Sequence, residues 1–247
     1  MKSFGVTDIG KKRKINQDYL FYSDEPVGCF SNLYIVADGM GGHKAGDKAS
    51  SYAVTRFVEL AKKTESVHPF QAMETIIRQV NQEVCRISLT QEEFQGMGTT
   101  FVAATELDQV IYAMNIGDSR LYFYDGESLC QITMDHSLVE ELVRAGELAP
   151  EESRNHPQKN IITRAIGVYE QLVPDFFKLA ICPNQKILLC SDGLSNMVDD
   201  EMLEEILSGD DSLEQEAERC RKEALFFGGT DNITVLIAQM EDRGCTQ

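Results

Sequence analysis

The chain has no apolar run that approaches the ~18 residues needed to span a membrane as a helix. Residues 1–5 lack the apolar segment of a secretory signal. Basic residues are also scarce, since 23 Lys and Arg face 40 Asp and Glu and leave a formal net charge of −17. That charge repels nucleic-acid phosphates and anionic lipid head groups. We therefore expect a soluble cytoplasmic protein with no nucleic-acid and no membrane partner.

The seven cysteines do not follow any common metal or redox motif. Their number is odd, and the closest pair, Cys182 and Cys190, is eight residues apart. This spacing excludes a zinc knuckle and a C-x-x-C redox pair. We expect free structural thiols, which suits a reducing compartment.

The chain also lacks internal repeats and linkers rich in Pro, Gly or Ser, so we expect residues 1–247 to form one domain. Apolar runs predict strands at 33–37, 99–105, 110–116, 121–124, 186–190 and 233–240, and Asp125-Gly126 predicts a hairpin into 128–132. Helical periodicity predicts helices near 45–60 and 69–87, a short helix at 138–143, and two helices that start near 199 and 212. This order favours an α+β sandwich over a βαβ repeat, with the irregular residues 135–175 as a surface excursion.

Carboxylates follow or precede several of the predicted strands. Asp38, Asp118 and Asp192 come just after strands, and Asp231 comes just before the last one. Carboxylates gathered at one rim would repel one another unless cations bridge them, and an all-oxygen ligand set favours Mg²⁺ or Mn²⁺. The alternative is that each Asp is an ordinary turn or helix-cap residue.

The loop after Asp38 contains four glycines between 39 and 46 and one histidine, His43. Glycine allows close backbone approach, so the Gly39 carbonyl is a candidate metal ligand. Beside a metal cluster, His43 is a candidate for proton transfer. A structural or solvent-exposed histidine is the alternative.

The basic run Lys11 to Lys14 is unusual in so acidic a chain. A solvent-exposed turn is its simplest explanation. Within the run, Arg13 alone has the forked donors that suit a phosphate. Asp18, four residues after the run, is a candidate to hydrogen-bond metal-bound water.

Taken together, six motifs resemble those of the PP2C-type (PPM) metal-dependent serine/threonine protein phosphatases, and most of all the compact bacterial enzymes that oppose Hanks-type kinases. They occur in the family's order from Arg13 to about Val235: Arg13-x-x-Asn16-Gln17-Asp18, Asp38-Gly39-Met40-Gly41-Gly42-His43, Gly96-Met97-Gly98-Thr99-Thr100, Gly117-Asp118-Ser119-Arg120, Ser191-Asp192-Gly193-Leu194 and Asp231-Asn232.

The resemblance implies a four-layer α/β/β/α sandwich, in which two central, mainly antiparallel sheets are flanked by helix pairs. It also implies two core Mn²⁺ or Mg²⁺ ions. Asp38 would bridge them, the Gly39 carbonyl would bind one, and Asp192 and Asp231 would hold the other. Asp118 matches the position that binds a third, weaker ion.

Further roles implied by the resemblance concern catalysis. Arg13 would bind the substrate phosphate, His43 would protonate the leaving serine or threonine oxygen, and Asp18 would lie behind the metal ligands. Residues 135–175 would form a flap near the active site. A metal-bridging hydroxide would attack phosphorus directly, without a covalent phosphoenzyme, and no cysteine here has an arginine six positions later to serve as an alternative nucleophile site.

The expected partners are phosphorylated proteins and a cognate Ser/Thr kinase, and the expected state is a monomer. Two other functions stay open from the sequence. One is a non-catalytic binding module on the same fold, and the other is a metal-dependent hydrolase of small phosphate esters or nucleotides.

Overall fold

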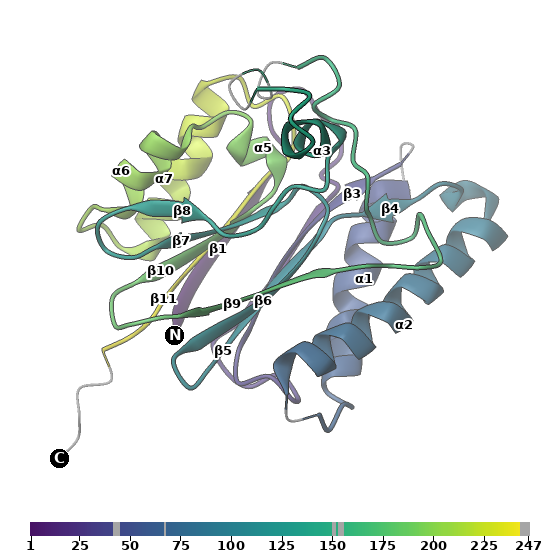
Figure 1. The fold of residues 1–247 in the computed structure, drawn as a ribbon, viewed down its shortest axis with the longest axis horizontal. Coiled ribbons are helices and arrows are strands. Elements are labelled where there is room, and N and C mark those ends of the chain that lie inside the picture. Colours follow the sequence, from purple (N-terminus) through teal and green to yellow (C-terminus); the bar gives the residue numbers. More distant parts are fainter. Residues whose placement is uncertain (42–44, 67, 150–151, 153–155, 243–247) are drawn as a thin grey trace.

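The computed structural model describes residues 1–41, 45–66, 68–149, 152 and 156–242 (Figure 1). Its strands form two antiparallel sheets that pack face to face. The first sheet holds, in spatial order, β1 (Lys2–Asp8), β11 (Ile233–Gln239), β10 (Lys186–Cys190), β7 (Arg120–Tyr124) and β8 (Leu129–Gln131). The second sheet holds β2 (Asp18–Ser23), β3 (Leu33–Met40), β5 (Phe101–Leu107), β6 (Val110–Ile116) and β9 (Asp175–Ala180), and β4 (Gly98–Thr99) pairs with the end of β3.

The interior strand β3 is apolar on both faces because each face meets another layer. Tyr34 and Val36 pack between the sheets, in one cluster with Leu189 and Leu236 of the first sheet. The alternating residues, such as Ile35, belong to the cluster beneath the helices. This double burial explains why the sequence of β3 reads as a continuous apolar run.

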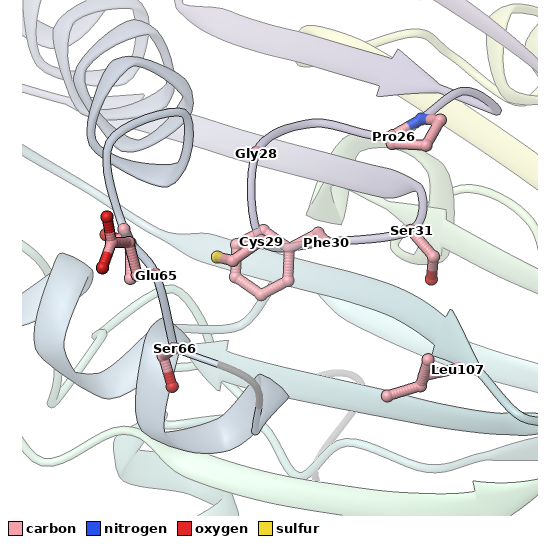
Figure 2. Close-up of a pocket in the computed structure, with 9 residues that line it drawn as sticks. Pro26, Gly28, Cys29, Phe30, Ser31, Glu65, Ser66 and Leu107 are labelled. Atoms are coloured by element: carbon pink, nitrogen blue, oxygen red, sulfur yellow. The ribbon is translucent and has the colours of Figure 1, made fainter.

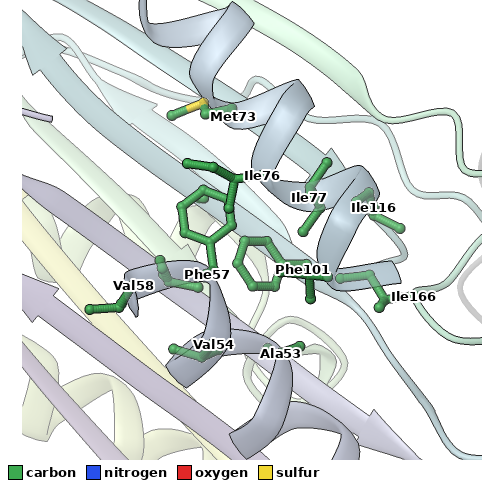
Figure 3. Close-up of a cluster of buried hydrophobic side chains, with 14 of the residues drawn as sticks. Ala53, Val54, Phe57, Val58, Met73, Ile76, Ile77, Phe101, Ile116 and Ile166 are labelled. Atoms are coloured by element: carbon green, nitrogen blue, oxygen red, sulfur yellow. The ribbon is translucent and has the colours of Figure 1, made fainter. Parts of the chain in front are cut away.

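Helices α1 (Ala45–Ala61) and α2 (Pro69–Thr90) cover the outer face of the second sheet (Figure 1). Proline opens α2 because its missing N–H would have no helical partner at that position. Figure 3 shows Phe57 of α1 and Ile76 of α2 beside Phe101 of β5, and the rings of Phe57 and Phe101 lie 5.1 Å apart.

Helices α5 (Asp192–Ser195), α6 (Asp200–Leu207) and α7 (Leu213–Phe226) cover the first sheet. Ser212 and Gln215 form a capping box that starts α7. Below these helices, Lys186 Nζ of β10 lies 2.5 Å from Glu216 Oε1 of α7 and donates to the Leu207 carbonyl at 2.7 Å. Lys186 therefore connects β10 to α6, through Leu207, and to α7, through Glu216.

The four-layer α/β/β/α sandwich is confirmed, and so are the helices predicted along the chain (Figure 1). The short helix is α3 (Leu138–Arg144), and the predicted hairpin joins β7 to β8. A 3-10 turn, η1 (Glu92–Phe94), follows α2. Among the described residues, no helix is long and apolar enough to cross a membrane.

One predicted strand was wrong in detail, and three strands were missed. The run 99–105 is divided between β4 and β5, because Thr100 leaves the ladder to hold Asp38. The strands β1, β2 and β9 were not predicted at all. Their sequences mix polar residues with half-buried apolar ones, and their pairing partners are distant in the chain.

Candidate metal centre

The predicted carboxylates gather at the end of the sandwich where β3 ends. Asp38 lies near the end of β3, and Asp18, the first residue of β2, is its direct partner in the antiparallel ladder. Asp192 starts α5 just after β10, and Asp118 follows β6. Strand pairing thus brings together residues that are far apart in the sequence.

Two threonines hold the backbone of Asp38. Thr100 Oγ1 accepts from the Asp38 amide at 2.9 Å, and the Thr100 amide and Thr99 Oγ1 both donate to the Asp38 carbonyl at 2.9 Å. Thr100 Oγ1 also lies 2.7 Å from Ser119 Oγ, next to Asp118. The motif around 96–100 therefore positions two of the predicted ligands.

Asp18 is buried between the two sheets at this end. Its Oδ2 accepts from Ser191 Oγ and from Thr234 Oγ1, both at 2.7 Å. Burial raises the pKa of Asp18 to about 7, and the negative charges of Asp192 and Asp231 add to the rise. The two hydrogen bonds act in the opposite direction, because they stabilise the carboxylate. Asp18 therefore lies beside the other carboxylates, and its predicted contact with metal-bound water stays a prediction.

The buried carboxylates fit a cation. One oxygen each of Asp18, Asp118 and Asp192 is buried without a hydrogen-bond partner. Burial, followed by the charges of Asp18 and Asp192, raises the pKa of Asp38 well above its usual value, and burial with Asp192 does the same to Asp118. The pKa of Asp192 is also raised, by burial and by Asp231. A divalent cation would supply the missing partners and remove the repulsion.

The described side chains do not by themselves form a closed ligand cage. Within the described ranges, no three His, Cys, Asp or Glu side chains converge on one point as metal ligands. Like-charged carboxylates repel one another, and one predicted ligand, Gly39, would contribute a backbone carbonyl. A further predicted ligand, Asp231, forms an ion pair with Arg13.

Asp231 pairs with the predicted phosphate-binding residue. Arg13 Nη2 donates to Asp231 Oδ2 at 2.6 Å, while Asp231 Oδ1 accepts from the Asn232 amide at 2.8 Å. Burial alone would lower the pKa of Arg13, but the bond to Asp231 and the charges of Asp38 and Asp192 outweigh it and raise the pKa. Arg13 therefore lies beside a predicted metal ligand, with its guanidinium held by a carboxylate, and its phosphate-binding role stays a prediction.

Gly39 lies where its backbone is crowded on both sides. A Cβ at Gly39 would come 2.0 Å from the Gly46 carbonyl and 2.7 Å from that of Gln17. Glycine is required here for close packing, while the role of its carbonyl as a metal ligand stays a prediction. The predicted proton donor His43 lies in 42–44, outside the described residues.

The supporting hydroxyls were missed by sequence reasoning. Ser119 and Ser191 each adjoin a predicted ligand, and a small hydroxyl residue beside an aspartate in a buried run is the signal that could have identified them. Asn232, quoted in a motif without a role, accepts from the Gln17 amide at 2.9 Å and donates to the carbonyls of Ile9 and Ile15. It connects the loop that carries Arg13 to Asp231.

The segment 135–175 begins and ends against the same end of the sandwich. His136 Nδ1 accepts from the Gly117 amide at 3.0 Å, and its Nε2 lies 3.0 Å from Asp175 Oδ2. Ile166 forms a bridge with Thr99 of β4. The described part of this segment therefore contacts Gly117, which precedes Asp118, and Thr99, which donates to the Asp38 carbonyl.

A pocket outside this centre lies at the other end of β3. Figure 2 shows it between the turn at Gly28, Cys29 and Phe30 and the segment with Glu65 and Ser66. Burial raises the pKa of the Cys29 thiol, so this thiol is not activated. We assign this pocket no catalytic role.

A family model described as protein phosphatase 2C matches residues 10–225. The serine/threonine phosphatase stp of Listeria monocytogenes is 41% identical over 95% of this chain and 94% of its own length. The solved serine/threonine phosphatase of S. agalactiae has a TM-score of 0.91 and 34% identity, and the match covers 97% of this chain and 99% of that one.

A third similar structure is the catalytic domain of the phosphatase PstP in complex with two manganese ions. Its TM-score is 0.86 at 30% identity, and the match covers 98% of both chains. These matches extend over nearly the whole chain and agree with the clustered carboxylates described above. The chain belongs to the protein phosphatase 2C family and is a protein serine/threonine phosphatase.

Proposed function

We propose that the chain is a metal-dependent phosphatase of phosphoserine and phosphothreonine that uses two core Mn²⁺ or Mg²⁺ ions and a third, weaker one. The observation that carries the proposal is the set of buried carboxylate oxygens on Asp18, Asp118 and Asp192 that have no hydrogen-bond partner. The two manganese ions of the PstP structure support the same assignment. When bound, such ions supply an activated water and neutralise charge on the phosphoryl group.

The chain's own residues have separate tasks in this proposal. Asp38, the Gly39 carbonyl, Asp192 and Asp231 hold the core ions, and Asp118 holds the third. Asp18, fixed by Ser191 and Thr234, orients water behind them.

Binding of the substrate phosphate falls to Arg13. Its guanidinium has several donors, so it can retain Asp231 with one edge and present the others to phosphate oxygens. His43 delivers the proton that the serine or threonine oxygen needs as it leaves.

At the scale of the cell, we propose that the protein acts in the cytoplasm as a monomer and opposes a Ser/Thr kinase of the Hanks type. Its substrates are phosphorylated proteins. Residues 1–247 form one phosphatase domain, in which 135–175 is a flap. The contacts of His136 and Ile166 near Asp118 and Asp38 support this position for the flap.

Phosphate release from a phosphothreonine peptide, measured with Mn²⁺, with Mg²⁺ and with excess EDTA, tests the proposal. We expect turnover with either metal and none in EDTA, together with a rise in melting temperature on adding Mn²⁺ to the metal-free protein. Full activity in EDTA, or no thermal stabilisation by either metal, would contradict the metal assignment.

A further inference from the structure

The basic run at 11–14 is not fully explained by phosphate binding. Lys11, Lys12 and Lys14 are exposed, and none has an ion-pair partner within the described part of the chain. Arg13 is the member that pairs with Asp231. Three exposed cations therefore surround the residue proposed to bind phosphate, in a chain whose net charge is −17.

The loop that carries these lysines is held firmly against the metal centre. The Lys11 amide donates to the Gly229 carbonyl at 2.7 Å, and Asn232 Nδ2 donates to the carbonyls of Ile9 and Ile15 at 2.9 and 3.1 Å. Gly10, with φ of +76°, is so close to Asp231 that a Cβ would lie 2.1 Å from its carbonyl oxygen. The position of this loop backbone relative to Asp231 is thus set by the Lys11 amide and by the Asn232 side chain.

An exposed aromatic pair adjoins the same loop. Phe226 ends α7 and Phe227 follows it, with 76% and 52% of their surfaces exposed. Their rings pack edge to face, 5.3 Å apart at 80°, so most of their apolar area faces solvent. Gly228, Gly229 and Thr230 connect this pair to Asp231, and the Lys11 amide donates to the Gly229 carbonyl.

We propose that Lys11, Lys12, Lys14, Phe226 and Phe227 form a docking surface for the phosphoprotein substrate. The inference rests on the proposed function and adds a substrate class: a segment with acidic side chains and a large apolar side chain near the phosphorylated residue. We refer to these five residues as the rim surface.

Charge complementarity identifies this partner. An acidic segment is repelled by most of a protein with this net charge, so the three lysines form a local exception that guides and orients it. Exposed aromatic rings next to such charges are typical of peptide-binding surfaces, where a few large side chains carry most of the affinity. A peptide anchored at Arg13 by its phosphate would place its nearest residues beside Lys12 and Lys14, the direct neighbours of Arg13 in the chain.

The test uses two phosphothreonine peptides, one with Asp and Phe flanking the phosphorylated residue and one with Ser at those positions. The variants are Lys11→Ser/Lys12→Ser/Lys14→Ser and Phe226→Ser/Phe227→Ser. Matched controls are Lys62→Ser/Lys63→Ser, a pair of exposed lysines just after α1, and Leu89→Ser, an apolar residue of α2 that is 81% exposed. The full chain is assayed with saturating Mn²⁺, and p-nitrophenyl phosphate serves as the small substrate.

We expect kcat/KM for the Asp/Phe peptide, relative to p-nitrophenyl phosphate, to fall about tenfold in the lysine variant and about five- to tenfold in the phenylalanine variant. The controls should stay within about twofold. The wild-type preference for the Asp/Phe peptide should shrink as salt rises from about 0.05 to about 0.5 M. Melting curves verify that each variant is folded.

Two results would overturn the inference. One is an equal loss on both peptides and on p-nitrophenyl phosphate, and the other is no preference of the wild-type protein for the Asp/Phe peptide. In both cases metal-dependent phosphate release would persist and the proposed function would stand. Absence of release from every substrate with Mn²⁺ would instead remove the proposed function itself.

Discussion

Asp18, Asp118 and Asp192 each keep one carboxylate oxygen buried without a donor, although buried polar atoms normally have one. Their surroundings raise their pKa values mainly by burial and then by mutual repulsion. Residues of this kind cost stability while the charge is uncompensated and become favourable once a cation binds. Single substitutions here should therefore change metal affinity and metal-free stability in opposite directions.

Asp192→Asn and Asp118→Asn should separate the core ions from the third ion. Asp192→Asn removes a core ligand, so it should abolish turnover and the tightest calorimetric Mn²⁺ binding event, while the metal-free protein melts at a higher temperature because one buried charge is gone. Asp118→Asn should retain tight Mn²⁺ binding and lose turnover by about tenfold or more. Equal loss of tight binding in both variants would show that the two residues do not have separate roles.

His43→Gln tests the proton donor proposed from the sequence. A threonine oxygen leaves poorly without a proton, whereas nitrophenolate leaves readily, so turnover of a phosphothreonine peptide should fall about 10²–10⁴-fold and that of p-nitrophenyl phosphate much less. Mn²⁺ affinity from calorimetry should change little. Parallel losses on the two substrates would instead assign His43 to the shape of its loop.

The helices of the outer layer are joined by polar contacts as well as by packing. Arg56 of α1 contacts Glu83 of α2 through two hydrogen bonds, of 2.7 and 3.0 Å, and Tyr52 donates to the same carboxylate at 2.8 Å. Hydrogen bonds from Arg56, and to a smaller extent from Gln79 and Tyr52, lower the pKa of Glu83 to about 2. Partial burial of the carboxylate acts in the opposite direction. These contacts of Tyr52 and Arg56 with Glu83 lie beside the apolar cluster of Figure 3 and hold the two helices in position relative to each other.

Glu83→Gln should destabilise the fold by about 1–2 kcal/mol at pH 7, a value reduced for the partial exposure of the pair. Because the folded-state pKa lies below the unfolded one, the contribution of Glu83 is complete above pH 4.5 and disappears as the pH falls toward 2. The deficit of the variant in urea unfolding should shrink over that range. Glu59→Gln, which loses a more exposed contact with Arg56, is the matched control and should cost about 0.5 kcal/mol or less.

The two sheets meet at one end of the molecule, where the buried aspartates with raised pKa values are concentrated. The carboxylates with raised pKa values come from both sheets, Asp18 and Asp38 from the second and Asp192 from the end of the first. A bound cation would therefore link the two sheets to each other at this end. The stability of the molecule should depend jointly on metal and pH.

Metal-free protein should lose stability as the pH rises from about 4.5 to about 7. In that range the folded state binds more protons than the unfolded chain, because burial raises the pKa of Asp18 to about 7 and raises those of Asp38, Asp118 and Asp192. Each such group contributes a slope on the order of 1 kcal/mol per pH unit.

The His136 imidazole acts in the opposite direction over this pH range. Burial lowers the pKa of His136, despite Asp175, so this single histidine adds stability as the pH rises toward 6.5. Several carboxylates outweigh it. Urea unfolding in EDTA should therefore show the decline and unfolding in excess Mn²⁺ should not, and metal-free stability that rises steadily from pH 4.5 to 7 would contradict the repulsion argued for this centre.

How far the sequence predicts this protein differs between elements. The helices predicted near 45–60 and 69–87 and the strands predicted at 33–37 and 110–116 are present, because strong apolar periodicity depends on neighbours within one element. The strand β3 continues beyond its predicted end, through Asp38 to Met40, because these residues pair with β2 and β4. The strand β1 was not predicted, because it is stabilised by full antiparallel pairing with β11, more than two hundred residues away, and by half-buried side chains. Thr100 broke a predicted strand because its hydroxyl holds Asp38, a contact with no local signal.

The sequence by itself determined the type of the strongly periodic elements, the order of the six motifs and the carboxylates that end the central strands. Tertiary structure decided which of these residues meet. Asp18 faces Asp38 because β2 pairs with β3 in that register, and Arg13 reaches Asp231 because Asn232 holds the loop of residues 9–15 against the start of β11. Side-chain periodicity is a local property, whereas register and hydrogen bonding between distant segments are chosen by the packing of the whole chain.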